Sequence, residues 1–155
     1  MIWTEQRIAL ARASLAKWHG TPHKNRIAVV GVGVDCIKLV YEVLFDAGIL
    51  PRCNFTGYDV DSGMWGESTK LQDTMLRCMH GVWVTEDFQF GDIFIMKTGK
   101  RSAHCGLYTA DGYVWHALGH RVVTRTDFVL WKREILGMVR IVNTGFRLNP
   151  SNVKF

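Results

Sequence analysis

Three residues have side chains and surroundings that could support nucleophilic catalysis: Cys36, His104 and His116. Cys36 follows the run Gly31-Val32-Gly33-Val34-Asp35 and opens a predicted helix. A thiol at a helix start lies near unpaired backbone N–H groups and the positive end of the helix dipole, which lower its pKa and can hold an oxyanion. Such a nucleophile needs a base, generally a histidine distant in sequence. The alternative interpretation of Cys36 is a small buried hydrophobic residue.

His104 is the candidate base, because it begins a run with the character of a β-strand, His104-Cys105-Gly106-Leu107-Tyr108. The two-residue period of a strand places His104 and Gly106 on one face and Cys105 on the other. Gly106 should then leave room for another group to approach the imidazole. Because His104 and Cys105 point to opposite faces, they cannot readily share a metal ion. The sequence offers no other pattern for a metal site, and we expect neither a metal nor a cofactor.

His116 can join His104 only if the turn between them has one particular length. A two-residue turn at Asp111-Gly112 would place His116 opposite Leu107, on the wrong face. A three-residue loop over 110–112, with Gly112 in the left-handed conformation, pairs His116 with Gly106. The two histidines would then be diagonal neighbours on one face. We predict the three-residue loop.

The surrounding sequence predicts helices first and a sheet afterwards. One helix is capped by Thr4 and ends by Gly20. A second runs from Cys36 to Ala47, should be the most buried, and stops at Gly48. Residues 51–66 have a loop composition, and a third helix is predicted from Glu67 to Met79.

Four later segments are rich in β-branched and aromatic residues and are separated by glycine or charged turns. They are Asp92 to Lys97, Ala103 to Thr109, Tyr113 to Leu118, and Gly137 to Val142. The order of elements predicts an α+β domain with an antiparallel sheet. A length of 155 residues is that of one domain, so we assign residues 1–155 to a single unit.

Composition limits the kinds of partner. Residues 97–155 carry 10 basic and 3 acidic side chains, against 9 and 11 in residues 1–96. The basic half could face an anionic polymer or an acidic protein, or could be an unevenly charged solvated surface. Its basic clusters are only pairs without interleaved aromatic residues, so nucleic acid is not the expected partner. No apolar run approaches the roughly 18 residues of a membrane span, and the charged N-terminus does not have the pattern of a signal peptide.

The remaining cysteines and histidines have less specific surroundings. Without an export signal the cysteines should be thiols, and no pair has the spacing of a zinc or redox site. We interpret Cys53, Cys78 and Cys105 as core or loop thiols, and His19, His80 and His120 as surface or capping groups.

The candidate residues also lie within an ordered set of motifs. These are Trp18-His19-Gly20-Thr21-Pro22, Asp35-Cys36 with Leu39-Val40, Gly48-Ile49-Leu50-Pro51-Arg52, Gly91-Asp92, His104-Cys105-Gly106-Leu107-Tyr108, and His116-Ala117. Their order and spacing resemble those of NlpC-type papain-like cysteine peptidases. The later segment from Trp131 to Arg140 is similar to the ending of small NlpC-like proteins encoded among phage tail genes and in gene transfer agents.

This resemblance implies a papain-like α+β core in which Cys36 is the nucleophile, His104 the base and His116 the polar group that orients it. Members of the family cleave peptidoglycan stem peptides, commonly at the γ-D-glutamyl to diamino acid bond, without a metal. The resemblance further implies a virion tail component, held by hub or fibre proteins at the tail tip, that opens the wall for genome entry. An inactive structural tail component with the same fold is the alternative, and a related acyl transfer is a third.

The sequence departs from the family pattern on the substrate side of the cleft. The small pair that usually follows Asp-Cys is replaced by Ile37 and Lys38, and the tyrosine usual after Thr-Pro is His23. The resemblance places Asp35, His23, Ile37 and Gly106 among the substrate-binding residues. The departures bear on which bond is preferred and leave the nucleophile and base unchanged.

Overall fold

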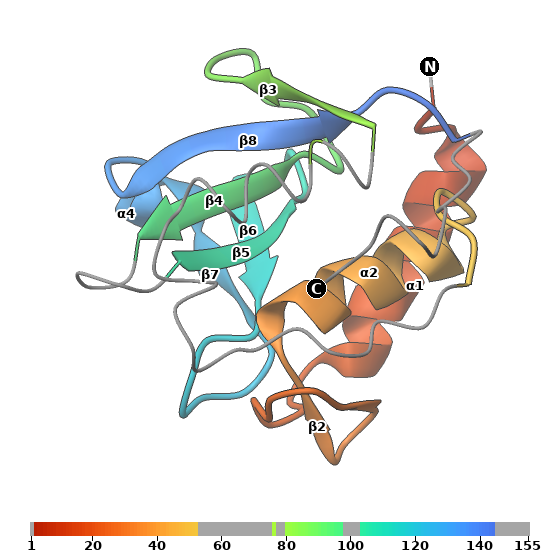
Figure 1. Cartoon of the computed structure of the whole chain (residues 1–155), viewed down its shortest axis with the longest axis vertical. Coiled ribbons are helices and arrows are strands. Elements are labelled where there is room, and N and C mark those ends of the chain that lie inside the picture. The colour runs from red at the N-terminus through yellow and green to blue at the C-terminus, as the bar shows by residue number, and fades with distance from the viewer. Residues whose placement is uncertain (1, 53–75, 77–79, 98–102, 145–155) are drawn as a thin grey trace.

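Two long helices pack against one face of a six-stranded antiparallel sheet in the computed structural model (Figure 1). The structure describes residues 2–52, 76, 80–97 and 103–144. Its helices are α1 (Glu5–Trp18), α2 (Cys36–Asp46) and the short α4 (Phe128–Trp131). Its strands are β1 (Ala28–Val29), β2 (Gly33–Val34), β3 (Gly81–Val84), β4 (Ile93–Lys97), β5 (Ala103–Tyr108), β6 (Tyr113–His116), β7 (Thr124–Asp127) and β8 (Ile135–Ile141). The large sheet has the order β3-β8-β4-β5-β6-β7, and β1 pairs only with β2.

Both N-terminal helices were correctly predicted. The Thr4 hydroxyl accepts a hydrogen bond from the Arg7 amide at 3.3 Å and caps α1. Six of the 11 residues of α2 are buried, against four of the 14 residues of α1, so α2 is the more buried of the two. The helix predicted from Glu67 to Met79 lies outside the described residues except at Leu76. No helix among the described residues is long and apolar enough to cross a membrane.

The four predicted strands correspond to β4, β5, β6 and β8, so the α+β prediction is confirmed. The strands β3 and β7 were not predicted, because Thr124–Asp127 is mostly polar and Gly81–Val84 is short. The short strand β2, directly before α2, was also not predicted. Gly33 and Val34 pair with β1, and a Cβ atom at Gly33 would lie 2.6 Å from the Cβ of Lys24.

The sheet buries a different set of apolar side chains on each face. On the helix face, Ile95, Cys105 and Leu107 join the main core with Leu39 and Val43 of α2. On the opposite face, a smaller core contains Phe94, Met96, Val114 and Met138, with Trp131 of α4 packed against it. Alternate residues of β5 therefore face two different cores. For this reason His104 and Cys105, near the N-terminal end of β5, lie in different surroundings.

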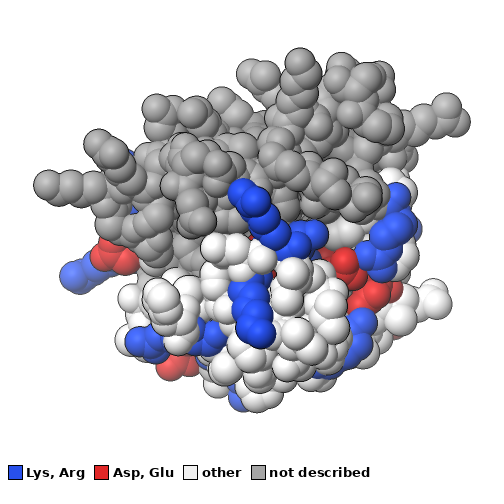
Figure 2. Space-filling view, turned by 60° about the horizontal axis from the view of Figure 1, so that its bottom comes forward, with Lys and Arg blue, Asp and Glu red and all other residues white. Residues whose placement is uncertain are grey.

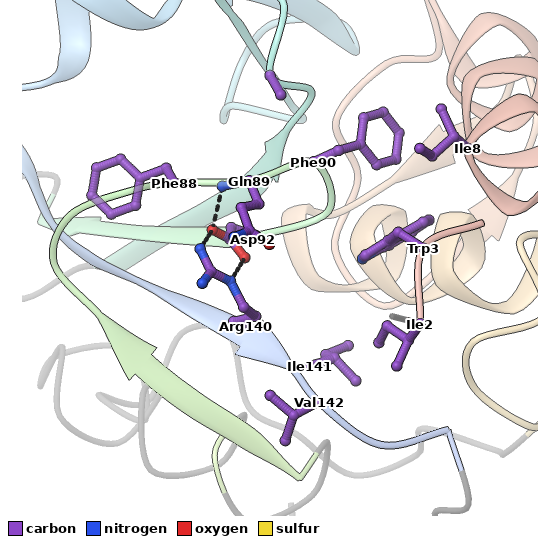
Figure 3. Close-up of a pocket in the computed structure, with 11 residues that line it drawn as sticks. Ile2, Trp3, Ile8, Phe88, Gln89, Phe90, Asp92, Arg140, Ile141 and Val142 are labelled. Atoms are coloured by element: carbon purple, nitrogen blue, oxygen red, sulfur yellow. Dashed lines mark hydrogen bonds and ion pairs between the residues drawn. The ribbon is translucent and has the colours of Figure 1, made fainter. Parts of the chain in front are cut away.

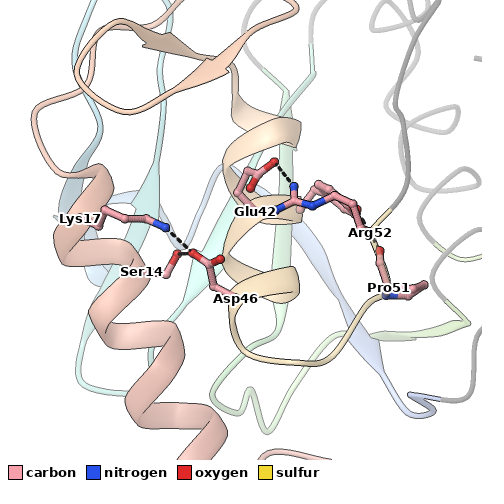
Figure 4. A network of polar contacts seen from close by, with 7 residues as sticks. Ser14, Lys17, Glu42, Asp46, Pro51 and Arg52 are labelled. Atoms are coloured by element: carbon pink, nitrogen blue, oxygen red, sulfur yellow. Dashed lines mark hydrogen bonds and ion pairs between the residues drawn. The ribbon is translucent and has the colours of Figure 1, made fainter.

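Polar contacts tie α1 to α2 and hold the segment after α2 (Figure 4). The Asp46 carboxylate accepts hydrogen bonds from the Ser14 hydroxyl at 2.6 Å and the Lys17 ammonium at 2.7 Å, which holds the pKa of Asp46 below its usual value. Arg52 donates to Glu42 at 2.7 Å and lies 3.5 Å above the ring of Phe45. These contacts fix the orientation of α2, the helix that carries Cys36.

A buried ion pair joins β8 to the start of β4 (Figure 3). Two guanidinium nitrogens of Arg140 donate to the Asp92 carboxylate at 2.8 and 2.9 Å. Asp92 is 1% exposed and also accepts from the Gln89 amide at 2.7 Å. The pair forms part of the wall of a cavity of about 550 Å³ that is otherwise lined mainly by apolar side chains of the N-terminus and β8.

Candidate active site

Cys36 is the first residue of α2, as predicted, and is partly exposed. The preceding Asp35 caps the helix: its Oδ1 accepts from the Lys38 amide and its Oδ2 from the Arg26 amide, both at 2.9 Å. The Asp35 carbonyl accepts from the Leu39 amide. This capping leaves the N–H groups of Cys36 and Ile37 without a partner inside the helix, beside the thiol.

The thiol lies against β5 at a point where the neighbouring strand has ended. The last paired residues of β5 and β6 are Gly106 and His116, so Cys105 has no partner in β6. The Cys36 sulfur interacts with the Cys105 thiol, with His104 and with the Cys105 amide, and each of these interactions lowers the pKa of Cys36. The sulfur lies beside β5 where β6 no longer pairs with it. It can therefore contact both Cys105 and His104, whose side chains belong to opposite faces of the sheet.

These contacts make Cys36 an acidic thiol. Hydrogen bonding from the Cys105 thiol, followed by hydrogen bonding and electrostatic attraction from His104, holds the pKa of Cys36 well below its usual value, against the opposing effect of burial. Burial and the neighbouring Cys36 raise the pKa of Cys105 well above its usual value. Of these two neighbouring thiols, Cys36 is therefore the more acidic. A thiolate beside an imidazole can attack a carbonyl carbon.

The three-residue loop predicted between the histidines is confirmed. Gly106 pairs with His116, and the Thr109 amide donates to the Tyr113 carbonyl at 3.2 Å, which leaves residues 110–112 as the loop. Gly112 has φ +88° as expected, and Ala110 also has a positive φ of +56°, which was not expected. The register places both imidazoles on one face, with ring centroids 5.4 Å apart and planes almost perpendicular.

Aromatic side chains enclose the two imidazoles on the sheet face away from α1 and α2. His104 is 4% exposed and His116 is 2% exposed. The ring of Phe94 lies 5.9 Å from that of His104, and the ring of Trp131 lies 4.2 Å from that of His116, measured between centroids. The short helix α4 therefore covers the histidine pair with its last side chain.

His116 is a neutral imidazole at physiological pH. Burial, reinforced by the charges of His104 and Arg121, lowers its pKa to about 3. Its Nε2 lies 2.8 Å from the Thr126 hydroxyl, whereas its Nδ1 has no hydrogen-bond partner among the described residues. A neutral, buried imidazole is suited to orienting the neighbouring His104 rather than to carrying charge itself.

The residues predicted to bind substrate lie in different surroundings. His23 is partly buried and forms a bridge with Val34, close to the start of α2. Asp35 is 2% exposed and holds the α2 cap, and Ile37 is 8% exposed and packs into the main core. Their observed contacts are therefore internal, and contact of these three residues with a substrate stays a prediction.

Gly106 does not leave open space beside His104, so that expectation was wrong. A Cβ atom at this position would lie 2.2 Å from the carbonyl oxygen of Trp115 and 2.5 Å from the ring of Phe94. The room that the missing side chain leaves is filled by Phe94, which packs against His104. Glycine is required at residue 106 for close packing.

Three residues that contact the site were not recognised from the sequence. Cys105 was interpreted as an ordinary core or loop thiol, although its position directly after His104 was the available signal. Trp131 lies after the last strand that we associated with the site, and Thr126 lies in β7, which was not predicted. No sequence signal linked either of them to His116.

On the face seen in Figure 2, the Lys and Arg side chains of the described residues are spaced apart and acidic side chains lie among them. Arg140 is paired with Asp92, and Arg125 lies 4.2 Å above the ring of Tyr113. Lys100, Arg101, Arg147 and Lys154 lie outside the described residues. Within the described part of the chain, no three His, Cys, Asp or Glu side chains are grouped so that they could hold a metal ion.

The sequence that forms this site matches the model of a known protein family. The model of the NlpC/P60 family matches residues 17–140, a segment that includes Cys36, His104 and His116. The chain belongs to the NlpC/P60 family. No curated protein matches it in sequence.

Solved structures of NlpC/P60 proteins share the fold at low sequence identity. An NLP/P60 family protein of Staphylococcus aureus, described as similar to a lipoprotein, aligns with a TM-score of 0.61 and 18% identity over 91% of this chain and 43% of its own length. The NlpC/p60 domain of the peptidoglycan hydrolase SagA aligns with a TM-score of 0.55 and 18% identity over 86% of this chain and 97% of that domain. This NlpC/P60 chain thus spans less than half the length of the staphylococcal protein.

The same fold also occurs in a protein without catalytic activity. RipD of Mycobacterium tuberculosis, described as a non-catalytic NlpC/p60 domain protein adapted to peptidoglycan binding, aligns with a TM-score of 0.57 and 18% identity over 90% of this chain and 100% of its own. Membership of the NlpC/P60 family therefore does not decide between cleavage and binding. The distinction between cleavage and binding depends on the side chains of the site.

Proposed function

We propose that the protein is a cysteine endopeptidase that cleaves peptidoglycan stem peptides, at the γ-D-glutamyl to diamino acid bond. The observation that carries the proposal is the acidic thiol of Cys36 at the start of α2, which interacts with His104, whose ring contacts the neutral His116. A structural protein has no need of a thiolate–imidazole pair at a helix N-terminus. Perturbed titration with a specific partner is typical of catalytic groups.

In the proposed reaction the Cys36 thiolate attacks the carbonyl carbon of the scissile amide. The N–H groups of Cys36 and Ile37, which have no partner inside the helix, are positioned to stabilise the oxyanion. The imidazolium of His104 then protonates the leaving amine, which gives an acyl-enzyme on Cys36. Water, deprotonated by the imidazole, hydrolyses this thioester and restores the free thiol.

Digestion of purified sacculi by the wild-type chain and by Cys36→Ala, read by mass spectrometry of the released muropeptides, tests this proposal. The wild type should release products that end at the cleaved γ-D-glutamyl bond, and the variant should release none while unfolding at about the same temperature. Retained cleavage by the variant would exclude Cys36 as nucleophile. Binding of sacculi by both proteins without any cleavage would overturn the peptidase proposal in favour of a binding role like that described for RipD.

We further propose that the protein acts from a phage tail, bound to hub or fibre proteins at the tail tip, and opens the wall locally for genome entry. The similarity of the segment from Trp131 to Arg140 to small tail-encoded proteins supports this location. The excess of basic residues in 97–155 provides charge for acidic tail proteins. Mass spectrometry of purified particles should find the chain in tails. Its absence from tails, together with its presence as a free enzyme in lysates, would contradict the proposal.

A further inference from the structure

Two buried nitrogen atoms of the histidine pair have no hydrogen-bond partner among the described residues. They are Nε2 of His104 and Nδ1 of His116. A buried polar atom without a partner costs about 1–3 kcal/mol. The rings are neighbours, with centroids 5.4 Å apart, so a hydrogen bond between the two nitrogens would satisfy both, although the structure contains no such bond. For that bond one imidazole has to donate and the other has to accept.

The direction of this bond is set by what His104 must do. When His104 takes the proton of Cys36 it becomes an imidazolium, in which both ring nitrogens carry hydrogen. One of these two hydrogens is directed at Cys36, and the other needs an acceptor. The orphan atom of His104 is Nε2, so the acceptor must be Nδ1 of His116, which requires the single hydrogen of the neutral His116 to be on Nε2.

Thr126 is the residue in contact with Nε2 of His116. The Thr126 hydroxyl oxygen lies 2.8 Å from that nitrogen. The register of β6 and β7 pairs Val114 with Thr126, so Thr126 and His116 are diagonal neighbours on one face. Of the groups around His116, His104 and Arg121 are basic and Trp131 is apolar, so Thr126 is the acceptor that the structure provides for an N–H on Nε2.

We propose that Thr126 is a positioning residue that fixes the tautomer of His116, accepting the N–H of Nε2 so that Nδ1 is left as an acceptor for the His104 imidazolium. The proposal rests on the proposed peptidase function and extends it by one residue behind the histidine pair. Without the Thr126 oxygen, the Nε2–H tautomer of His116 would lose its hydrogen-bond acceptor and would no longer be favoured. On Nδ1 the hydrogen would meet the Nε2–H of His104 donor to donor and would oppose formation of the ion pair with Cys36.

Thr126→Val removes the hydroxyl and keeps the shape, and Thr126→Ser keeps the hydroxyl. The rate of Cys36 alkylation by iodoacetamide, measured from pH 4 to 9, reports the thiolate–imidazolium pair without any substrate. Near neutral pH, Thr126→Val should be alkylated about tenfold more slowly than the wild type, as expected for the loss of about one buried hydrogen bond. Thr126→Ser should stay within about twofold of the wild type. With muropeptides as substrate, Thr126→Val should lower kcat and leave KM unchanged, because Thr126 lies behind His116.

Nitrogen-15 NMR of the imidazoles at pH 7 gives the tautomer directly in the wild type, so the test does not depend on the folding of a variant. The proposal expects the Nε2–H form of His116 in the wild type and in Thr126→Ser. A wild-type His116 in the Nδ1–H form would overturn it, and so would an unchanged alkylation profile in a folded Thr126→Val. If sacculi stay intact while the alkylation and NMR results are as expected, the peptidase proposal fails and the role of Thr126 in the thiol–histidine pair stands.

Discussion

At the scale of single residues, the chemistry of the site depends on which neighbours the Cys36 sulfur has at the edge of β5. The Cys105 thiol is its main hydrogen-bond donor, and His104 adds a hydrogen bond and a positive charge. Cys105 is buried in the main core and His104 lies among the aromatic side chains of the other face. The Cys36 thiol is therefore influenced by residues from both faces of the sheet.

Replacing Cys105 should make Cys36 less reactive. Cys105→Val puts a somewhat larger apolar side chain at this position and removes the S–H donor, so the pKa of Cys36 rises and the thiolate fraction at neutral pH falls. We expect iodoacetamide to alkylate Cys36 about three- to tenfold more slowly at pH 7, since one neutral hydrogen bond contributes about 0.5–1.5 kcal/mol. Cys105→Ser, which keeps a donor, is the matched control. Equal alkylation rates in the wild type and in Cys105→Val would show that the Cys105 thiol does not stabilise the thiolate.

The depressed pKa of His116 predicts a loss of stability in mild acid. Its pKa of about 3 in the folded protein lies below the value of about 6.5 expected for an unfolded chain. As the pH falls below about 6.5, the unfolded state gains a proton that the folded state does not, so the free energy of unfolding falls until about pH 3. The loss attributable to His116 between pH 7 and 5 should be about 2 kcal/mol.

Urea unfolding at pH 7 and pH 5 measures that loss. His116→Gln, which cannot be protonated, should lose about 2 kcal/mol less than the wild type over this interval. The carboxyl groups of Asp46 and Asp111, whose pKa values are also lowered, titrate below this window. Identical losses in both proteins would mean that His116 is protonated in the folded state at pH 5.

At the scale of elements, the site depends on two local structures that bring its parts into register. The Asp35 cap fixes where α2 begins and thereby leaves the amides of Cys36 and Ile37 beside the thiol. The three-residue loop over 110–112 sets the register of β6 and thereby the face on which His116 lies. A shift of one residue in this register would move His116 to the helix face of the sheet.

Removing the Asp35 carboxylate should destabilise the start of α2. The two oxygens hold the Lys38 and Arg26 amides, so Asp35→Ala leaves both donors without this acceptor. We expect the free energy of unfolding to fall by about 2 kcal/mol, a little more than the usual cost of losing a helix cap because the side chain is buried. Asp35→Asn keeps one acceptor oxygen and should lose about half as much. An Asp35→Ala protein as stable as the wild type in urea would contradict this account of the cap.

At the scale of the whole molecule, one buried ion pair links segments that are 48 residues apart in sequence. Asp92 at the start of β4 and Arg140 near the end of β8 are joined by two hydrogen bonds, and the Asp92 side chain is 1% exposed (Figure 3). The contact holds neighbouring strands in the middle of the sheet order β3-β8-β4-β5. Removing one partner of such a pair leaves the other charge without compensation.

Asp92→Ala should therefore be strongly destabilising, by about 3 kcal/mol in urea unfolding, because it leaves the Arg140 guanidinium and the Gln89 amide without their acceptor. Lys17→Met, which breaks an ion pair whose lysine side chain is 48% exposed, is the comparison and should cost less than about 1 kcal/mol. Iodoacetamide should alkylate Cys36 at the wild-type rate in both variants below their unfolding transitions. If both variants lost the same small amount of unfolding free energy, the buried Asp92–Arg140 pair would contribute no more to stability than the exposed pair.

Local sequence by itself determined the elements that carry the candidate residues. The helix start at Cys36, the strand alternation at His104 and the loop length before His116 all follow from capping residues, two-residue periodicity and the glycine at 112, which act over a few neighbouring residues. The family motifs then ordered these elements along the chain. The cap of α1 and the α+β order of the elements were predictable too, because neither requires knowledge of distant contacts.

Only the tertiary structure decided what surrounds the two histidines and the thiol. Cys105 contacts Cys36 because β6 ends before it, Phe94 fills the space at Gly106, and Thr126 and Trp131 reach His116 through a strand and a short helix that lie later in the chain. Such contacts depend on pairing between strands and on packing across the sheet, which local periodicity does not encode. The elements that carry the candidate residues could thus be predicted from the sequence, whereas the neighbours of those residues were set by which strands became adjacent.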